Sequence, residues 1–373
     1  MKKEVTKKQA QEFQKQSYKI KVYNWARLIS LIYLFVFAIE LIKKASFSLA
    51  PKINALLLMN LSPIKSVSIG WLTTSFVQSS GAVGSIVATF AGENLINLQT
   101  VVYILVGASI GTTITALIIS LITYSKKKRD FRHGFEIGLA CSIYGIFLAA
   151  IVLSLEYFFK FFSKISLIVA TKIHGEISIL RIPNLIETIT DSVINLFFED
   201  SSKILILALG FIILIFTLRF LGKSIIALLG GEQKTRNKIN KYFHSKYKTY
   251  LIGFLLTAVV FSSSITIGLL VPLAVSRLIN LKKAIPFILG ASLGTFSDLF
   301  LISIIIGKVN AIATAVSFFM FALIGGIIFL PNSNLLFKIT KYVSKKIMHI
   351  SRKKVFLILL IFILTPLAII LLF

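Results

Sequence analysis

The sequence predicts an all-α polytopic membrane protein, arranged as an inverted-topology repeat with two re-entrant helical hairpins and broken transmembrane helices. Three observations predict this fold. The chain is 56% hydrophobic and only 15% charged. Its charges gather between long apolar runs, and a polar pattern in its first half recurs in its second half. A soluble protein of 373 residues could not cover so much apolar surface with polar groups.

Seven apolar stretches approach the roughly 20 residues that a membrane-spanning helix needs. We expect uninterrupted spans at about 24–42, 100–123, 134–157, 202–222, 283–306, 309–330 and 354–372. Two further stretches, about 66–92 and about 249–276, are interrupted by Gln78-Ser79-Ser80-Gly81 and by Ser262-Ser263-Ser264. Polar runs at that depth are tolerated only inside protein or beside a water-filled cavity. Both stretches are therefore predicted to be re-entrant hairpins with serines at their tips.

These elements divide the chain into six predicted segments. They are a basic cytoplasmic tail at 1–22, a first transmembrane repeat at 23–157, an extracellular connection at 158–200 with an amphipathic helix opened by Pro183, a second repeat at 201–330, a basic cytoplasmic loop at 331–353, and a C-terminal transmembrane helix at 354–373. Basic clusters between spans place the N-terminus in the cytoplasm of a multi-pass protein of the cell membrane. The net charge of +27 is expected to face lipid headgroups, so we expect the lipid bilayer and no nucleic acid as a partner.

The duplicated pattern emerges at a shift of 183 residues, which places Ser79 on Ser262. About 16 of the 43 positions from 70 to 112 are then identical. Apolar bias would align Leu with Leu. It would not align Ser-Ser, Asn-Leu and Gly-Ala-Ser-x-Gly-Thr in one register. Three predicted spans separate corresponding points, and an odd number inverts the second copy.

Inverted repeats with broken helices that meet at the membrane midplane are a feature of secondary transporters. A broken helix offers free N–H groups and the positive end of its dipole to an anion. Its unwound carbonyls and hydroxyls offer oxygen ligands to a small hard cation. The sequence therefore predicts a transporter that couples a small anion to a cation.

Each motif also has a structural interpretation. The serine tips could be Ser/Gly contacts between membrane helices, and the Gly-x-x-x-Gly spacing at Gly107 and Gly290 could be close helix packing. Duplication of both motifs at one shift favours a binding site. Asp298 lies deep in a predicted span, where an acid is costly, and we expect it to couple sodium or protons. The alternative is a buried ion pair with a basic residue such as Arg219. Glu40 and Glu136 lie nearer span ends, where we expect interfacial solvation.

The paired motifs resemble the sodium–phosphate cotransporter family, the type II group with its bacterial relatives. That family carries two Gln-Ser-Ser-Ser-type motifs, each followed by a Gly-Ala-Asn-x-Gly-Thr-Thr-like motif. The resemblance covers about 25 to 330. This chain departs from the pattern in five places: Gly81 stands for Ser, Phe261 for Gln, Ser109 and Ser292 for Asn, and Phe296 for Thr.

The resemblance implies sodium-driven uptake of inorganic phosphate by alternating access, with sodium as the coupling ion and no other cofactor. The matching positions for phosphate are Gln78, Ser79, Ser80, Ser262, Ser263 and Ser264. The candidates for sodium are Ser109, Thr112, Thr113, Thr266, Ser292, Thr295 and Asp298. Two alternatives stay open, a transporter of another small oxyanion or organic phosphate and a non-transporting membrane scaffold. An enzyme is not expected, because no His lies near a hairpin tip in the sequence. An oligomer is compatible with the sequence.

Overall fold

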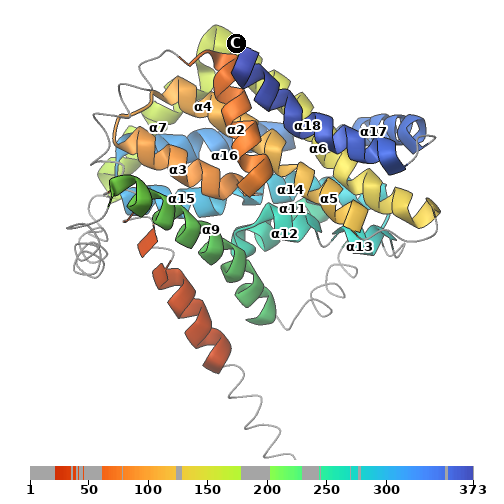
Figure 1. The fold of residues 1–373 in the computed structure, drawn as a ribbon, viewed down its shortest axis with the longest axis horizontal. Coiled ribbons are helices and arrows are strands. Elements are labelled where there is room, and N and C mark those ends of the chain that lie inside the picture. The colour runs from red at the N-terminus through yellow and green to blue at the C-terminus, as the bar shows by residue number, and fades with distance from the viewer. Residues whose placement is uncertain are drawn as a thin grey trace, which may run out of the picture.

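The structure is a computed structural model of the chain. It describes residues 22–34, 61–77, 79–122, 128–177, 202–228, 245–268, 270–275, 279–348 and 352–372, with a few isolated positions between these ranges. Within these ranges the regular elements are all helices and none is a strand. The prediction of an all-α protein is therefore confirmed (Figure 1).

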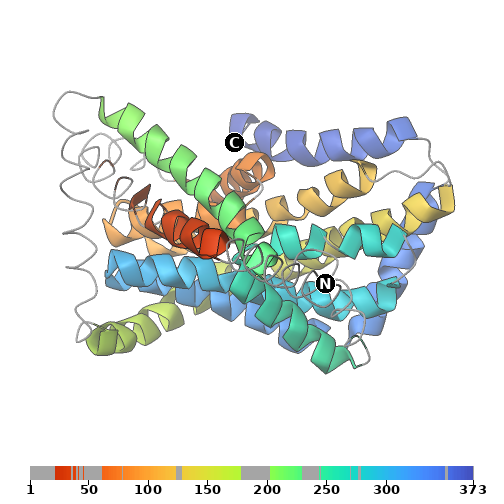
Figure 2. The same cartoon turned by 90° about the horizontal axis from the view of Figure 1, so that it is seen from below.

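Four of the described helices are long and apolar enough to cross a membrane. They run over Leu98–Ile118, Arg132–Phe159, Leu281–Ile306 and Val309–Phe329, which matches four of the predicted spans. Two further helices cover other predicted spans: α9 (Lys203–Leu228) and α18 (Arg352–Leu372). In Figure 2, α9 and α18 lie along the outside of the bundle.

Each stretch predicted as a hairpin consists of helices that are separated at the predicted serine tip. The first comprises α2 (Pro63–Val77) and α3 (Ser80–Gly92). In the second, α11 (Lys246–Val260) is followed by α12 (Ser263–Gly268) and α13 (Leu270–Val275). In Figure 1, α3 lies toward the left of the bundle and α12 and α13 toward the right.

Two spans predicted to be uninterrupted are each broken after the Gly-Ala-Ser-x-Gly-Thr motif. The first consists of α4 (Leu98–Thr112) and α5 (Ile114–Ile122), and the second of α14 (Leu281–Gly294) and α15 (Phe296–Ile306). Threonine hydroxyls near the breaks donate to carbonyls of the preceding turn, a bond that competes with the regular helical pattern.

The local structure of the two repeats recurs at the 183-residue shift. A Cβ at Gly107 would overlap the backbone of α2 at Val67, and a Cβ at Gly290 would overlap α11 at Tyr250, the corresponding position. A Cβ at Gly70 would likewise overlap Ile104 O. Small residues of this kind let membrane helices approach to backbone contact. The glycines of the motif therefore pack the first helix of each hairpin onto the broken span that follows it.

The two repeats pack across each other. Helix α3 contacts α15 and α16 (Val309–Phe329) of the second repeat, while α13 contacts α5 and α6 (Lys128–Phe159) of the first. Both views show α3 beside α15 and α16 (Figures 1 and 2). Side chains from both halves, such as Leu105, Leu148 and Phe321, belong to one hydrophobic core. Each hairpin tip is therefore held by the other repeat.

Two helices lie in segments predicted as connections. Helix α7 (Phe161–Ile177) packs on α16, within the predicted connection at 158–200. Helix α17 (Ser333–Met348) occupies most of the predicted loop at 331–353. Its apolar residues recur every three or four positions, for example at Leu336, Val343 and Ile347, which is the spacing of an amphipathic helix. The amphipathic helix predicted after Pro183 lies outside the described residues.

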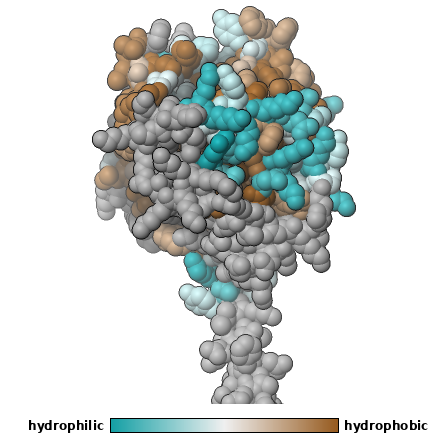
Figure 3. All heavy atoms as spheres, turned by 90° about the vertical axis from the view of Figure 1, so that its right-hand side faces the viewer, coloured by the Kyte–Doolittle hydropathy of each residue, from teal (hydrophilic) through white to brown (hydrophobic). Residues whose placement is uncertain are grey.

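The expectation of interfacial solvation at Glu136 is wrong. Its side chain is fully buried and accepts hydrogen bonds from Arg132 Nε at 3.0 Å, Lys341 Nζ at 2.6 Å and Ser344 Oγ at 3.2 Å. The sequence does not reveal this because Lys341 and Ser344 come from the overlooked helix α17. Helix α17 lies toward the right-hand end of the bundle in Figure 1, and Figure 3 shows that hydrophilic side chains gather on that end.

Candidate functional site

A cavity of about 60 Å³ lies where the two hairpin tips meet the two broken spans. This volume is several times the roughly 10–15 Å³ that a single ordered water needs. Its polar lining consists of hydroxyl side chains, contributed by Ser80, Ser109, Thr112, Thr113, Thr115, Tyr144, Ser263, Ser264, Ser292 and Thr295. Its apolar lining includes Phe318 and Phe321 of α16. The site is therefore rich in neutral hydroxyl groups.

The cavity brings together most of the residues predicted for phosphate and sodium. From the hairpin tips it collects Ser80, Ser263 and Ser264, and from the broken spans it collects Ser109, Thr112, Thr113, Ser292 and Thr295. Residues far apart in sequence thus meet in one place. The hydroxyls of Ser80 and Ser263 make no hydrogen bond within the part of the chain that the structure describes.

Four of the predicted residues do not line the cavity, and Gln78 lies outside the described residues. Ser79 caps α3, where its Oγ accepts from Ala82 N at 3.1 Å. The hydroxyl of Thr266 is 2.8 Å from Thr257 Oγ1 and ties α12 to α11. Ser262 precedes α12 and is also absent from the lining. The fourth residue is Asp298.

The helix ends at the tips differ in conformation. Ser79 has the extended backbone of an ordinary N-cap, and α3 begins at Ser80 beside the cavity. At the second tip Phe261 has φ 54°, in the left-handed region that residues other than glycine seldom adopt. Such backbone strain is often found at ligand sites. The residue standing in place of Gln is therefore the point at which the second hairpin turns.

Most hydroxyls along the broken spans use their protons within their own helices. Ser109 donates to Val106 O at 2.7 Å, and Thr112 donates to Ala108 O at 3.0 Å. In the second repeat Thr295 donates to Ala291 O at 3.1 Å. A hydroxyl has one proton and two lone pairs. These side chains therefore present oxygen lone pairs to the cavity, which suits a small hard cation such as sodium.

Asp298 lies against the tip of the first hairpin. Its side chain is 1% exposed, and a Cβ added to Gly81 would overlap Asp298 Oδ2. Oδ1 accepts a hydrogen bond of 2.7 Å from Leu299 N, and no ion pair to Asp298 occurs within the described residues. Gly81 belongs to the first turn of α3, where the helix dipole favours a negative charge. The basic partner considered from the sequence, Arg219, has a side chain outside the described part.

The symmetry-related pair of positions has a different chemistry. At the 183-residue shift Gly81 corresponds to Ser264 and Asp298 corresponds to Thr115. Both Ser264 and Thr115 line the cavity. Both pairs therefore join positions from the two repeats, but one consists of two hydroxyl residues and the other of a carboxylate and a glycine that leaves room for it.

Comparison with known proteins identifies the family. A profile described as Na+/Pi-cotransporter matches residues 34–175 and 213–332, well over half of the chain. The chain belongs to the Na+/Pi-cotransporter family. The two matched blocks contain the two hairpins and the two broken spans that form the cavity.

Individual members of the family are more distant. Sodium-dependent phosphate transport protein 2A of Oryctolagus cuniculus is 28% identical over 194 residues, which are 49% of this chain and 29% of the relative. The corresponding protein of Ovis aries is 29% identical over the same length. Protein 2B of Homo sapiens is 25% identical over 185 residues, or 48% of this chain and 26% of the relative. The alignments thus span less than a third of these relatives. No solved structure gives a significant match.

Two hydroxyl-bearing residues that line the cavity of this Na+/Pi-cotransporter family member were not predicted as site residues. Thr115 could have been found from the sequence, because it occupies the position of Asp298 in the first repeat. Tyr144 had no such signal, because it lies in α6 among apolar residues and outside every duplicated motif. Both reach the cavity only because α5 and α6 pack against the second hairpin.

Proposed function

We propose that this chain is a secondary active transporter that moves inorganic phosphate together with sodium by alternating access. One observation carries the proposal: a single cavity is lined by duplicated residues from both hairpins and both broken spans. A scaffold gains nothing from such a cavity. The named relatives are sodium-dependent phosphate transport proteins, which supports the choice of substrate and coupling ion.

The chemistry of the cavity supports an oxyanion. Ser80 and Ser263 contribute hydroxyls from opposite hairpins, and α3 begins beside the cavity with the positive end of its dipole. A dehydrated oxyanion needs several short hydrogen bonds from compact donors. Hydroxyls that project from two crossed repeats supply them from more than one side.

Sodium is proposed to bind the oxygens of the broken spans together with Asp298. The carboxylate lies against Gly81, the residue after Ser80, so an oxyanion held by Ser80 is near a buried negative charge. A sodium ion at Asp298 would relieve this repulsion. Binding of the cation would then strengthen binding of the anion, and the anion would strengthen binding of the cation by the same factor. This reciprocity is what coupled transport requires.

The crossed packing of the repeats supports alternating access. Each hairpin tip is held by the other repeat, and α3 and α12–α13 lie on different sides of the bundle (Figure 1). In an inverted repeat the two hairpins open the same site toward opposite sides of the membrane in turn. We place the protein in the cell membrane with the N-terminus and the lysines of α17 in the cytoplasm, as the positive-inside rule favours.

Uptake into proteoliposomes tests the proposal. We expect a sodium gradient, directed inward, to drive accumulation of labelled phosphate, and a potassium gradient of equal size to drive none. Unlabelled phosphate should compete more strongly than sulfate or a phosphate monoester. If sulfate or the monoester abolished sodium-driven uptake at a lower concentration than unlabelled phosphate does, the substrate would be another oxyanion or an organic phosphate. No sodium-driven uptake of any of these would contradict the proposal.

A further inference from the structure

Two side chains of the cavity have buried hydroxyl groups without any hydrogen-bond partner among the residues that the structure describes. They are Thr115 in α5 and Tyr144 in α6. Most hydroxyls along the broken spans donate to carbonyls of their own helices, so these two differ from their neighbours. An unsatisfied buried hydroxyl is costly and rare in native proteins. Both groups therefore need a partner inside the cavity.

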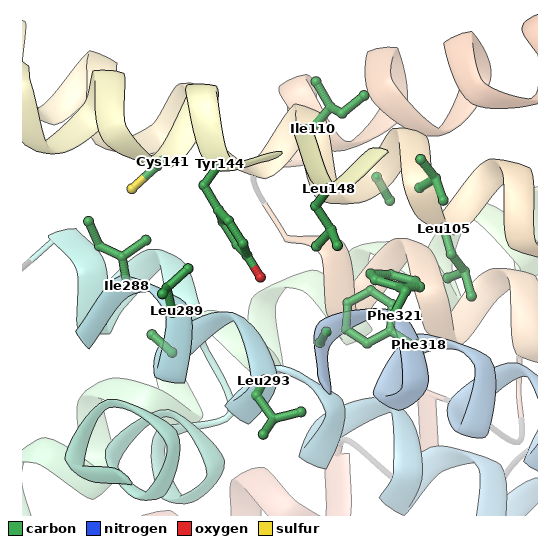
Figure 4. Close-up of a cluster of buried hydrophobic side chains, with 14 of the residues drawn as sticks. Leu105, Ile110, Cys141, Tyr144, Leu148, Ile288, Leu289, Leu293, Phe318 and Phe321 are labelled. Atoms are coloured by element: carbon green, nitrogen blue, oxygen red, sulfur yellow. The ribbon is translucent and has the colours of Figure 1, made fainter. Parts of the chain in front are cut away.

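Tyr144 is held in one orientation by its surroundings. Its ring is 4% exposed and packs edge-to-face on Phe329, with ring centroids 5.5 Å apart. A Cβ at Gly325 would overlap the Tyr144 hydroxyl, so a glycine at this point of α16 leaves room for it. Figure 4 shows the side chain leaving α6 with its hydroxyl oxygen directed toward α14 and α16. Ser292 of α14 is its polar neighbour there and is close enough to act on the hydroxyl, although no hydrogen bond of ordinary distance and angle joins them.

The hydroxyl proton determines which kind of ligand could be the missing hydrogen-bond partner. A phenol donates one hydrogen bond and accepts others. A sodium ion would use a lone pair and leave the buried proton without an acceptor. An oxyanion supplies the acceptor, and hydrogen bonds to an ionised acceptor are shorter and stronger than neutral ones. The buried donors thus match the anion rather than the cation.

We infer that Tyr144 is a substrate-binding residue that donates its hydroxyl proton to the transported oxyanion, with Thr115 as a second donor beside the second hairpin. The inference rests on the proposed function and adds residues to its anion site. It also accounts for two departures from the family pattern. Gly81 and Phe261 stand where that pattern has Ser and Gln, and the hydroxyls of Thr115 and Tyr144 supply two donors from other helices.

The test compares Tyr144→Phe with Tyr250→Phe. Tyr250 is a matched control, because its hydroxyl packs on Gly326, next to Gly325, and does not line the cavity. In sodium-driven uptake, Tyr144→Phe should raise the KM for inorganic phosphate by about tenfold or more, since it removes a hydrogen bond to a charged group. Tyr250→Phe should leave the KM within about twofold of the wild type.

Thermal stability in detergent separates binding from a structural role. Without phosphate, Tyr144→Phe should melt at the wild-type temperature or above it, because it removes an unsatisfied polar group. The rise in melting temperature that inorganic phosphate produces in sodium buffer should shrink in Tyr144→Phe and persist in Tyr250→Phe. Thr115→Val should shift the KM in the same direction.

The outcomes distinguish this inference from the function on which it rests. If the wild type shows neither sodium-driven phosphate uptake nor stabilisation by phosphate, the proposed function fails and the inference fails with it. If the wild type shows both, while Tyr144→Phe and Thr115→Val keep the wild-type KM and phosphate shift, the inference alone is overturned. That second result would indicate that the two hydroxyls bind an ordered water molecule and not the substrate.

Discussion

Glu136 and Asp298 are both almost completely excluded from solvent, and their surroundings differ. Glu136 bonds to Arg132, Lys341 and Ser344, so its charge is compensated by the protein. Asp298 accepts only from Leu299 N among the described residues and faces Gly81. A buried charge is tolerated when it is paired or binds a metal ion. The difference indicates that Glu136 is structural, whereas Asp298 is available for a cation.

The position of each acid agrees with this division. Glu136 fastens α6 to α17 at the end where hydrophilic side chains gather (Figure 3). Asp298 contacts the tip of a hairpin whose first residue, Ser80, lines the cavity. One acid therefore joins two helices without lining the cavity, and the other touches an element that is proposed to move during transport.

The largest expected effect comes from removing Glu136. Glu136→Ala leaves Lys341 and Arg132 without their buried partner, and breaking a buried ion pair of this kind costs about 3–5 kcal/mol. We expect a large fall in detergent thermal stability and in folded yield. Protein that survives purification should keep the sodium dependence of phosphate uptake. Wild-type stability for this variant would contradict the structural role.

The next largest effect comes from filling the space beside Asp298. In Gly81→Ser the new Cβ overlaps the carboxylate, and overpacking of this kind typically costs about 1–3 kcal/mol. The double variant Gly81→Ser, Asp298→Thr copies the residue types of the symmetry-related positions, Ser264 and Thr115. Thermal stability should recover in the double variant, with a coupling energy of roughly 1–3 kcal/mol.

Ser264→Gly is the matched control for this cycle. It removes a hydroxyl at the corresponding position without creating an overlap, so it should cost less stability than Gly81→Ser. If the effects of Gly81→Ser and Asp298→Thr on stability were additive, the contact between Gly81 and Asp298 would contribute nothing to stability.

The smallest effect on stability is expected from Asp298→Asn, which keeps the size and most hydrogen bonding of the side chain. Removing the charge should raise the sodium concentration required for half-maximal phosphate uptake by about tenfold, because a carboxylate ligand raises cation affinity. Uptake should be measured against sodium concentration beside thermal stability. Unchanged sodium dependence with a large loss of stability would show that Asp298 has a structural role like that of Glu136.

Much of this architecture could be predicted from the sequence, because membrane burial forces apolar spans and makes any polar interruption conspicuous. The serine tips at Ser79 and Ser262 predicted where both hairpins are interrupted. The duplicated glycines at Gly107 and Gly290 marked a close helix contact in each repeat. The duplicated pattern also identified, from the sequence alone, most of the hydroxyl residues that line the cavity.

Other features depend on contacts between elements that the sequence does not pair. Glu136 appeared to lie near an interface, because nothing in the local pattern announced that α17 covers it. Tyr144 lies in an ordinary apolar helix and reaches the cavity only through tertiary packing. In the sequence, Gly81 and Asp298 are two separate positions at which the repeats differ. Only the structure shows that these two residues are in contact.

A shared anion site between the two hairpins is tested most directly by the phosphate KM of Ser80→Ala and Ser263→Ala. Sodium-driven uptake into proteoliposomes should be measured for both variants. Ser85→Ala is the control, because Ser85 lies one turn further along α3, bonds to Gly81 O at 2.6 Å and does not line the cavity. We expect both tip variants to raise the KM for phosphate by about tenfold, and Ser85→Ala to leave it unchanged. A wild-type KM in either tip variant would contradict a site built by both repeats.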